Sequence, residues 1–89
     1  MKEMTWTVYM LECSDGTLYT GISSNVEQRL AHHEKGKGAR YTKGRGPFTV
    51  VYVEPKETKG EALKREKAIK SLRRQEKVRL IAEFRRLRE

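Results

Sequence analysis

The sequence predicts a small α+β fold, a three-stranded sheet flanked by helices in the order ββαβα(α). Three observations predict it. Short segments rich in β-branched and aromatic residues alternate with segments whose apolar residues recur at helical spacing. Helix-capping residues open the helical segments, and Gly or Pro residues interrupt the chain between elements. Because the chain has 89 residues, we expect one domain with a small core over residues 1–89.

The first two predicted strands cover residues 6–13 and 17–22, and a Ser-Asp-Gly segment joins them as a hairpin. The register depends on the length of that loop. A two-residue turn would place Tyr9 and Tyr19 on opposite faces of the sheet. A three-residue loop would place both tyrosines on one face and Tyr9 opposite Gly21, which would leave room for a substrate. The sequence permits either register.

Ser24 and Glu27 form a capping box, which predicts a helix that continues to about Glu34. The next segment, residues 36–47, contains four glycines and a proline and is predicted to form a loop. A third strand is expected over residues 48–54, where the following proline ends it.

Thr58 and Glu61 form a second capping box and open a helix that carries Glu66. Glu66 falls on the same side of this helix as Leu63 and Ile69, in the stripe expected to be buried. A buried carboxylate needs a positive partner, because removing water from an unpaired charge is costly. We therefore expect a Lys, an Arg or a divalent metal ion beside Glu66.

A further apolar stripe lies within residues 77–87. No Gly or Pro separates it from the preceding helix, so one bent helix and two helices both remain open. A third hypothesis is a protein-interaction domain that dimerises through the face formed by Leu80, Ile81, Phe84 and Leu87. We accordingly expect a monomer or a weak homodimer.

The charge distribution indicates a polyanionic partner. The net charge is +8, and residues 56–89 hold thirteen Lys or Arg against six Glu. This asymmetry favours nucleic acid over a membrane surface, although a basic face that only keeps the protein soluble is the simpler alternative. No apolar run is long enough to span a membrane, and the N-terminus lacks the features of a signal peptide. With Cys13 as the one cysteine, we expect a cytoplasmic protein.

Two tyrosine motifs stand ten residues apart, Thr7-Val8-Tyr9 and Tyr19-Thr20-Gly21. They resemble the paired motif of the GIY-YIG nuclease family. The resemblance covers about residues 6–81 and is most like the small stand-alone bacterial members. It continues, in the family's order, with Arg29, His33 and Glu66.

The resemblance implies metal-dependent hydrolysis of phosphodiester bonds. Glu66 would hold one Mg²⁺ or Mn²⁺ ion, a hard cation that prefers oxygen ligands. Tyr9 would accept the proton of the attacking water or orient that water. Arg29 would grip the phosphate, and Tyr19 and His33 would complete the pocket.

Each of these residues also has a structural explanation. The two tyrosines could be ordinary half-buried strand residues, and Arg29 could form an ion pair with Glu66. His33, next to another histidine, could lie at the surface. The paired histidines and the lone cysteine do not have zinc-site spacing.

The glycine-rich loop suits contacts to a nucleic-acid backbone and base stacking rather than a nucleotide P-loop, because no strand leads into it and no GKS/T follows. The residues expected to bind nucleic acid there are Lys35, Lys37, Arg40, Tyr41, Lys43 and Arg45.

The sequence departs from the family pattern in two places. Thr7 stands where the first motif usually has glycine, and the asparagine that many members carry after the glutamate is absent, so Ser71 or Gln75 would have to substitute. The alternative is therefore a non-catalytic nucleic-acid-binding module with the same fold. In either case DNA is favoured over RNA, and a partner protein could supply the targeting.

Overall fold

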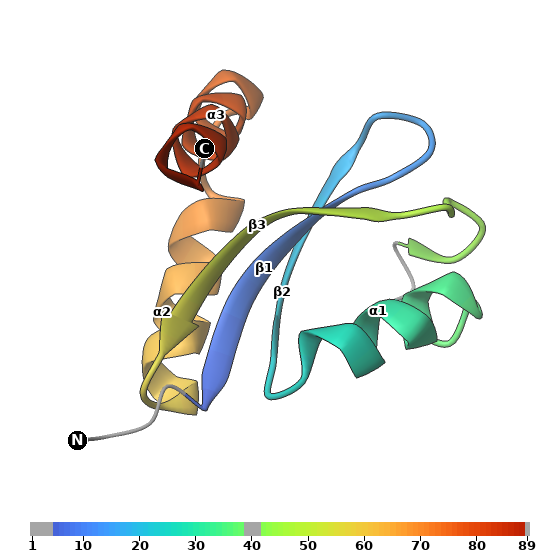
Figure 1. Ribbon diagram of the computed structural model, residues 1–89, viewed down its shortest axis with the longest axis horizontal. Helices are drawn as coiled ribbons and strands as arrows, with labels where there is room; N and C mark the ends of the chain where they lie inside the picture. Colours follow the sequence, from blue (N-terminus) through green and yellow to red (C-terminus); the bar gives the residue numbers. More distant parts are fainter. Residues whose placement is uncertain (1–4, 39–41, 89) are drawn as a thin grey trace.

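The computed structural model describes residues 5–38 and 42–88. Their elements confirm the predicted α+β class. The C-terminal part, for which one bent helix and two helices were both open, forms two helices (Figure 1). The sheet is antiparallel, with strand order β2-β1-β3. In chain order the elements are β1 (Trp6–Glu12), β2 (Leu18–Ser23), α1 (Val26–Glu34), β3 (Thr49–Lys56), α2 (Lys59–Lys70) and α3 (Arg74–Arg88).

The hairpin between β1 and β2 has the three-residue loop. Tyr9 pairs with Gly21, so Tyr9 and Tyr19 lie on the same face of the sheet. Gly16 has a φ of 83°, which the left-handed position of such a loop requires. The Asp15 carboxylate accepts hydrogen bonds from the backbone and the hydroxyl of Thr17, which fixes the turn.

The helix starts follow capping chemistry, with one correction. The predicted Ser24 cap is wrong, because Asn25 is the N-cap of α1 and its side-chain oxygen accepts the Gln28 N–H at 3.1 Å. The Thr58 cap of α2 is as expected, and its hydroxyl accepts the Glu61 N–H at 3.1 Å.

The break between α2 and α3 needs neither glycine nor proline. The Ser71 hydroxyl donates to the Ala68 carbonyl at 2.7 Å and so satisfies a group at the end of α2. Arg73 lies two residues after Ser71 and directly before α3. Its backbone N–H donates to the Glu76 carboxylate at 3.2 Å, as the glutamate of a capping box accepts the N–H of the N-cap residue. Side-chain capping on both sides of the turn stabilises two helices over one.

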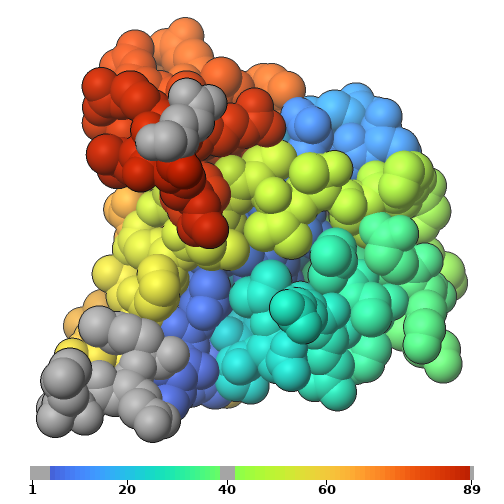
Figure 2. Space-filling view, in the orientation of Figure 1, coloured from blue at the N-terminus to red at the C-terminus, as the bar shows by residue number. Residues whose placement is uncertain are grey.

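The sheet separates two apolar clusters. One lies under α2 and α3 and includes Val8, Met10 and Ile69. The other lies on the face covered by α1 and includes Tyr9 and Leu11. In the space-filling view, α3 and α1 lie on opposite sides of β3 (Figure 2).

The third strand runs on through Pro55, although the sequence predicted that this proline would end it. Because β3 lies at an edge of the sheet, the missing N–H of Pro55 removes no essential ladder bond. In the described ranges, no helix has the length and apolar character needed to cross a membrane.

Candidate active site

Tyr9 lies at the centre of the group of residues predicted to be catalytic. Its side chain projects from the central strand and is only 1% exposed. The hydroxyl oxygen lies 3.1 Å from Nε2 of His33. The ring centroid of Tyr19 lies 6.3 Å from that of Tyr9. The hairpin register and helix α1 thus bring three of the predicted residues together.

His33 is buried, contrary to the surface position that its His-His context allowed. Its Nδ1 lies 2.7 Å from the hydroxyl oxygen of Thr42, and its ring packs edge-on against Tyr19 at 5.2 Å. Gly38 lies against the ring so closely that a Cβ atom there would be 2.2 Å from Nδ1. Neither Gly38 nor Thr42 was predicted from the sequence as part of the site. In the sequence they are only a glycine and a threonine of the glycine-rich loop, and nothing in that pattern indicates that they contact His33.

The room expected opposite Tyr9 at Gly21 is filled by Tyr9 itself. A Cβ at Gly21 would lie 2.7 Å from the Tyr9 hydroxyl oxygen and 3.1 Å from Cε2 of Tyr19. The expectation of substrate space at this glycine is therefore corrected. Gly21 allows both tyrosine rings to fold across β2, so any substrate must approach from outside the rings.

The electrostatics of this group oppose a charged tyrosine. Burial raises the pKa of Tyr9 to about 12, and the nearby Tyr19 and Glu66 act in the same direction. Arg29 opposes this shift through a hydrogen bond with Tyr9 and through its charge. For His33, burial and then the charge of Arg29 lower the pKa, so the imidazole is neutral at pH 7. Both polar partners are therefore uncharged in the resting site.

Glu66, on α2, lies close enough to this group for its charge to help raise the pKa of Tyr9. Its side chain is 18% exposed, and one oxygen lies 3.6 Å from Nζ of Lys70, the positive partner that the sequence required. The buried stripe is narrower than predicted, because Leu63 is 45% exposed. The alternative in which Arg29 pairs with Glu66 has no such contact among the described residues.

The donor set around Glu66 suits a hard cation that keeps most of its water ligands. The described residues contain no group of three His, Cys, Asp or Glu side chains arranged to hold a metal. Glu66 offers one partly exposed carboxylate, and its amine partner is 52% exposed and held only at 3.6 Å. A carboxylate with such a loose partner can exchange it for Mg²⁺ or Mn²⁺.

The glycine-rich loop is only partly described. Lys35, Lys37 and Lys43 are exposed, as backbone contacts to nucleic acid require. Arg40 and Tyr41 lie outside the described residues. Arg45 is paired with the Asp15 carboxylate in the β1–β2 turn, a contact that sequence reasoning missed.

Neither substitute for the missing asparagine contacts the group around Tyr9. The Ser71 hydroxyl is used at the end of α2, and Gln75 is exposed on α3. The stripe predicted as an interaction surface is mostly covered by the chain's own sheet. Ile81 is buried and Phe84 packs against Tyr52, whereas Leu87 is 78% exposed.

Comparison with known proteins agrees with this architecture. Residues 5–79 match the family model of the GIY-YIG catalytic domain. A UPF0213 protein of Staphylococcus aureus strain N315 is 55% identical over 76 residues, which is 85% of this chain and 93% of that protein.

Two solution NMR structures are also similar. The UPF0213 protein BH0048 from Bacillus halodurans is 44% identical, with a TM-score of 0.57 over 86% of this chain and 82% of that one. The protein EF2693 from E. faecalis is 35% identical, with a TM-score of 0.63 over 96% and 92%. The chain, in which the two tyrosine motifs face α1 and Glu66 approaches from α2, therefore belongs to the GIY-YIG family, among its bacterial UPF0213 members.

Proposed function

We propose that this protein is a metal-dependent endonuclease that hydrolyses phosphodiester bonds in nucleic acid. The family implies nuclease-type function, and GIY-YIG nucleases generally use a divalent metal ion. The observation that carries the proposal is the buried contact between Tyr9 and His33, within electrostatic reach of Arg29, Tyr19 and Glu66.

Tyr9 receives the proton of the attacking water through a relay. Because its pKa is about 12, Tyr9 keeps its proton at neutral pH and cannot simply act as a phenolate. Neutral His33 can take that proton on Nε2 while its Nδ1–H donates to the Thr42 hydroxyl oxygen. The O–H bond of water then breaks as its proton passes to the Tyr9 oxygen and the Tyr9 proton passes to His33.

Arg29 holds the phosphate and stabilises the negative charge that develops on it. A guanidinium offers two parallel N–H donors to phosphate oxygens, a geometry that an ammonium lacks. Arg29 is partly exposed, so it can reach outward while its charge acts on Tyr9 and His33. Tyr19, packed against His33, limits how far the imidazole can turn.

Glu66 is the residue that would hold a Mg²⁺ or Mn²⁺ ion. When bound, the ion would supply polarisation of the phosphate and stabilisation of the leaving oxygen. Binding requires Glu66 to exchange its contact with Lys70, which is long and largely solvated.

Nucleic acid is the partner that the charge distribution supports, with DNA favoured over RNA. The exposed lysines of the loop and the excess of Lys and Arg in residues 56–89 favour contacts to phosphates rather than to bases. Such contacts carry little sequence information. We therefore infer that the protein selects nucleic acids weakly, or by their structure rather than their sequence. We further infer that it acts in the cytoplasm and that a partner protein supplies the targeting.

A non-catalytic binding module is the second candidate. The observation that favours it is the raised pKa of Tyr9, since a buried, protonated tyrosine bonded to a neutral histidine is also a stable structural pair. The absence of the asparagine that many family members carry points in the same direction.

Cleavage assays separate the two candidates. Labelled single-stranded, duplex and branched DNA, and RNA, are incubated with Mg²⁺, Mn²⁺ or EDTA. Tyr9→Phe and Glu66→Gln are tested against two matched controls: Tyr52→Phe, which removes a hydroxyl bonded to Glu54, and Glu61→Gln, an exposed carboxylate on α2.

We expect metal-dependent cleavage that both site variants abolish and both controls retain. Cleavage that persists in EDTA or in Glu66→Gln would contradict the proposed site. No cleavage, with salt-sensitive binding in every variant, would establish the binding module.

A further inference from the structure

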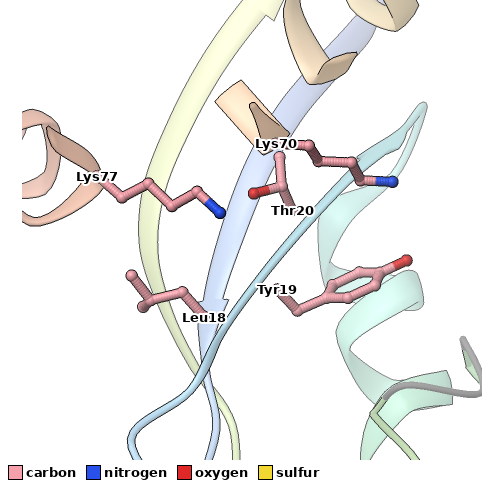
Figure 3. A pocket seen from close by; sticks show the side chains of 5 residues that line it. All are labelled: Leu18, Tyr19, Thr20, Lys70 and Lys77. Carbon is pink, nitrogen blue, oxygen red and sulfur yellow. The ribbon is translucent and has the colours of Figure 1, made fainter. Parts of the chain in front are cut away.

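A second feature of the molecule, a cavity at the free edge of β2, has no role in the chemistry described above. Its volume is about 330 Å³, and it is bounded by β2, the end of α2 and the start of α3 (Figure 3). The side chains that line it are Leu18, Tyr19, Thr20, Lys70 and Lys77. We refer to it as the β2-edge pocket.

The β2-edge pocket is positively charged. Two of its five lining residues are lysines, and none is an Asp or a Glu. Lys70 has only the long contact with Glu66, and its side chain is 52% exposed. Lys77 is partly buried, and among the described residues it has no ion-pair partner. Two lysines that line one pocket with no acidic residue among the lining side chains favour an anionic ligand.

Thr20 gives an independent indication. Its side chain is 3% exposed, and its hydroxyl is the one buried side-chain polar atom in the described residues that lacks a hydrogen-bond partner. Buried hydroxyls nearly always have a partner. In Figure 3 this hydroxyl points toward the side of the pocket where the Lys77 amine lies. An oxygen-rich anion that draws the amine toward itself could accept a hydrogen bond from both groups.

We propose that the β2-edge pocket binds a backbone phosphate of the nucleic-acid strand that enters the candidate active site. This inference rests on the proposed function for its choice of ligand. Tyr19 belongs to both places, because it lines the pocket and packs against His33. Lys70 also belongs to both, because it lines the pocket and contacts Glu66.

The two sites therefore meet at the edge of β2, where Tyr19 lies on the α1 face of the sheet and Thr20 on the face of α2 and α3. A nucleic-acid strand that crosses this edge would present neighbouring phosphates to both sites. A nucleic-acid backbone supplies one negative charge per nucleotide at regular spacing, which a free anion does not. The pocket would hold the strand in register while Arg29 and Glu66 act on the neighbouring phosphodiester.

Lys77→Met is the sharpest test, because it removes the charge, keeps most of the stem and leaves Glu66 and Lys70 untouched. The matched control is Lys67→Met, which removes one exposed charge from α2 outside the pocket. Binding of a short labelled single-stranded DNA is followed by fluorescence anisotropy in EDTA at several salt concentrations.

We expect Lys77→Met to bind roughly fivefold more weakly at low salt and to lower the slope of log affinity against log salt by about 0.7, the value for one lost phosphate contact. Lys67→Met should leave that slope unchanged. Equal effects of the two variants would mean diffuse attraction to a basic surface and would overturn the pocket.

Amide NMR shifts then locate the ligand. A thymidine dinucleotide should shift the amides of residues 18–20 and 77 in the wild-type protein and not in Lys77→Met. Inorganic phosphate at the same concentration should shift them far less. Equal shifts by both ligands would mean a site for free anions and would contradict the assignment to a nucleic-acid backbone.

The readouts separate this inference from the proposed function, because binding is measured without metal and without cleavage. If the protein binds DNA through Lys77 but cleaves nothing, the phosphate-binding pocket is supported and the nuclease proposal is wrong. If the protein cleaves DNA and Lys77→Met leaves DNA binding unchanged, the nuclease proposal is supported and the phosphate-binding pocket is wrong.

Discussion

Nε2 of His33 and the hydroxyl oxygen of Tyr9 lie 3.1 Å apart, and each side chain is only 1% exposed. The hydrogen bond between them is therefore part of the core as well as the centre of the candidate site. Changes that disturb it should alter stability and activity together, whereas changes at Arg29 or Glu66, nearer the solvent, should alter activity with less effect on folding.

The first prediction concerns stability against pH. Burial lowers the pKa of His33 below 6.5 in the folded state, whereas the unfolded chain keeps the ordinary value. Below pH 6.5 the unfolded state therefore binds more protons, and the free energy of unfolding must fall as the pH falls, by at most about 1.4 kcal/mol per pH unit. Urea unfolding at pH 7.5, 6.5 and 5.5 measures this.

In that pH window His32→Gln should retain the dependence and His33→Gln should lose it. The carboxylates with lowered pKa values, Asp15 and Glu54, act only at lower pH. A dependence that survives in His33→Gln would assign the effect to other groups.

The second prediction concerns cleavage against pH. If neutral His33 accepts the Tyr9 proton, the single-turnover rate should be flat at neutral pH and fall only when the pH drops below 6.5, where His33 becomes protonated. A phenolate mechanism would instead raise the rate about tenfold per pH unit toward the Tyr9 pKa of about 12. Rates measured from pH 5.5 to 9 distinguish the two.

The third prediction is that Gly21→Ala damages both the fold and the site. The new Cβ would lie 2.7 Å from the Tyr9 hydroxyl oxygen, so the ring or strand β2 must shift, which disturbs the 3.1 Å contact between Tyr9 and His33. We expect a loss of about 1–3 kcal/mol in unfolding free energy, as in other overpacked cores, and at least a tenfold loss of cleavage.

The matched control for that change is Gly60→Ala at the start of α2. The nearest atom to its added Cβ, apart from the glycine's own neighbours, is 3.9 Å away, so it should stabilise the helix by up to about 1 kcal/mol. Chemical denaturation measures the unfolding free energy of both variants. Equal losses of unfolding free energy in Gly21→Ala and Gly60→Ala would refute the steric argument.

The fourth prediction is that Thr42→Val weakens the candidate site by removing a hydrogen-bond partner of His33. Removing the hydroxyl 2.7 Å from Nδ1 leaves a buried imidazole nitrogen without this partner, at a cost of about 1–3 kcal/mol. It also frees the imidazole to change tautomer, so cleavage should fall more than DNA binding does. Thr49→Val, at an exposed position of β3, is the control and should be nearly neutral.

The fifth prediction has the opposite sign. Thr20→Val should raise the unfolding free energy by about 1 kcal/mol, because it replaces a buried hydroxyl that has no hydrogen-bond partner with a methyl group. The same variant should bind single-stranded DNA more weakly. A variant that is both less stable and unaltered in binding would remove the reason to assign Thr20 to the pocket.

Local rules predicted much of the fold. The Thr58 cap, the three strands and the helical order depend on interactions between near neighbours, and these were predicted from sequence. The hairpin register was left open because a Ser-Asp-Gly segment is compatible with two loop lengths. Only the pairing of Tyr9 with Gly21 resolves it.

The environment of the predicted catalytic residues could not be predicted in the same way. Resemblance selected Tyr9, Arg29 and Glu66, and their catalytic roles stay predictions. The partners that set the chemistry of His33, namely Gly38 and Thr42, follow it by five and nine residues in a loop without regular periodicity. Likewise, the Lys77 contribution to the β2-edge pocket depends on the angle between α2 and α3, which no single-residue pattern encodes.

The pairing of Arg45 with Asp15 has a consequence for how the glycine-rich loop meets a ligand. Thr42 is fixed to His33 at one end of a four-residue stretch, and Arg45 is fixed to the β1–β2 turn at the other. Lys43 is held between these two anchors and remains exposed. A phosphate that binds Lys43 therefore meets a segment whose ordering entropy was already lost on folding, so binding there carries a smaller entropic penalty than on a free loop.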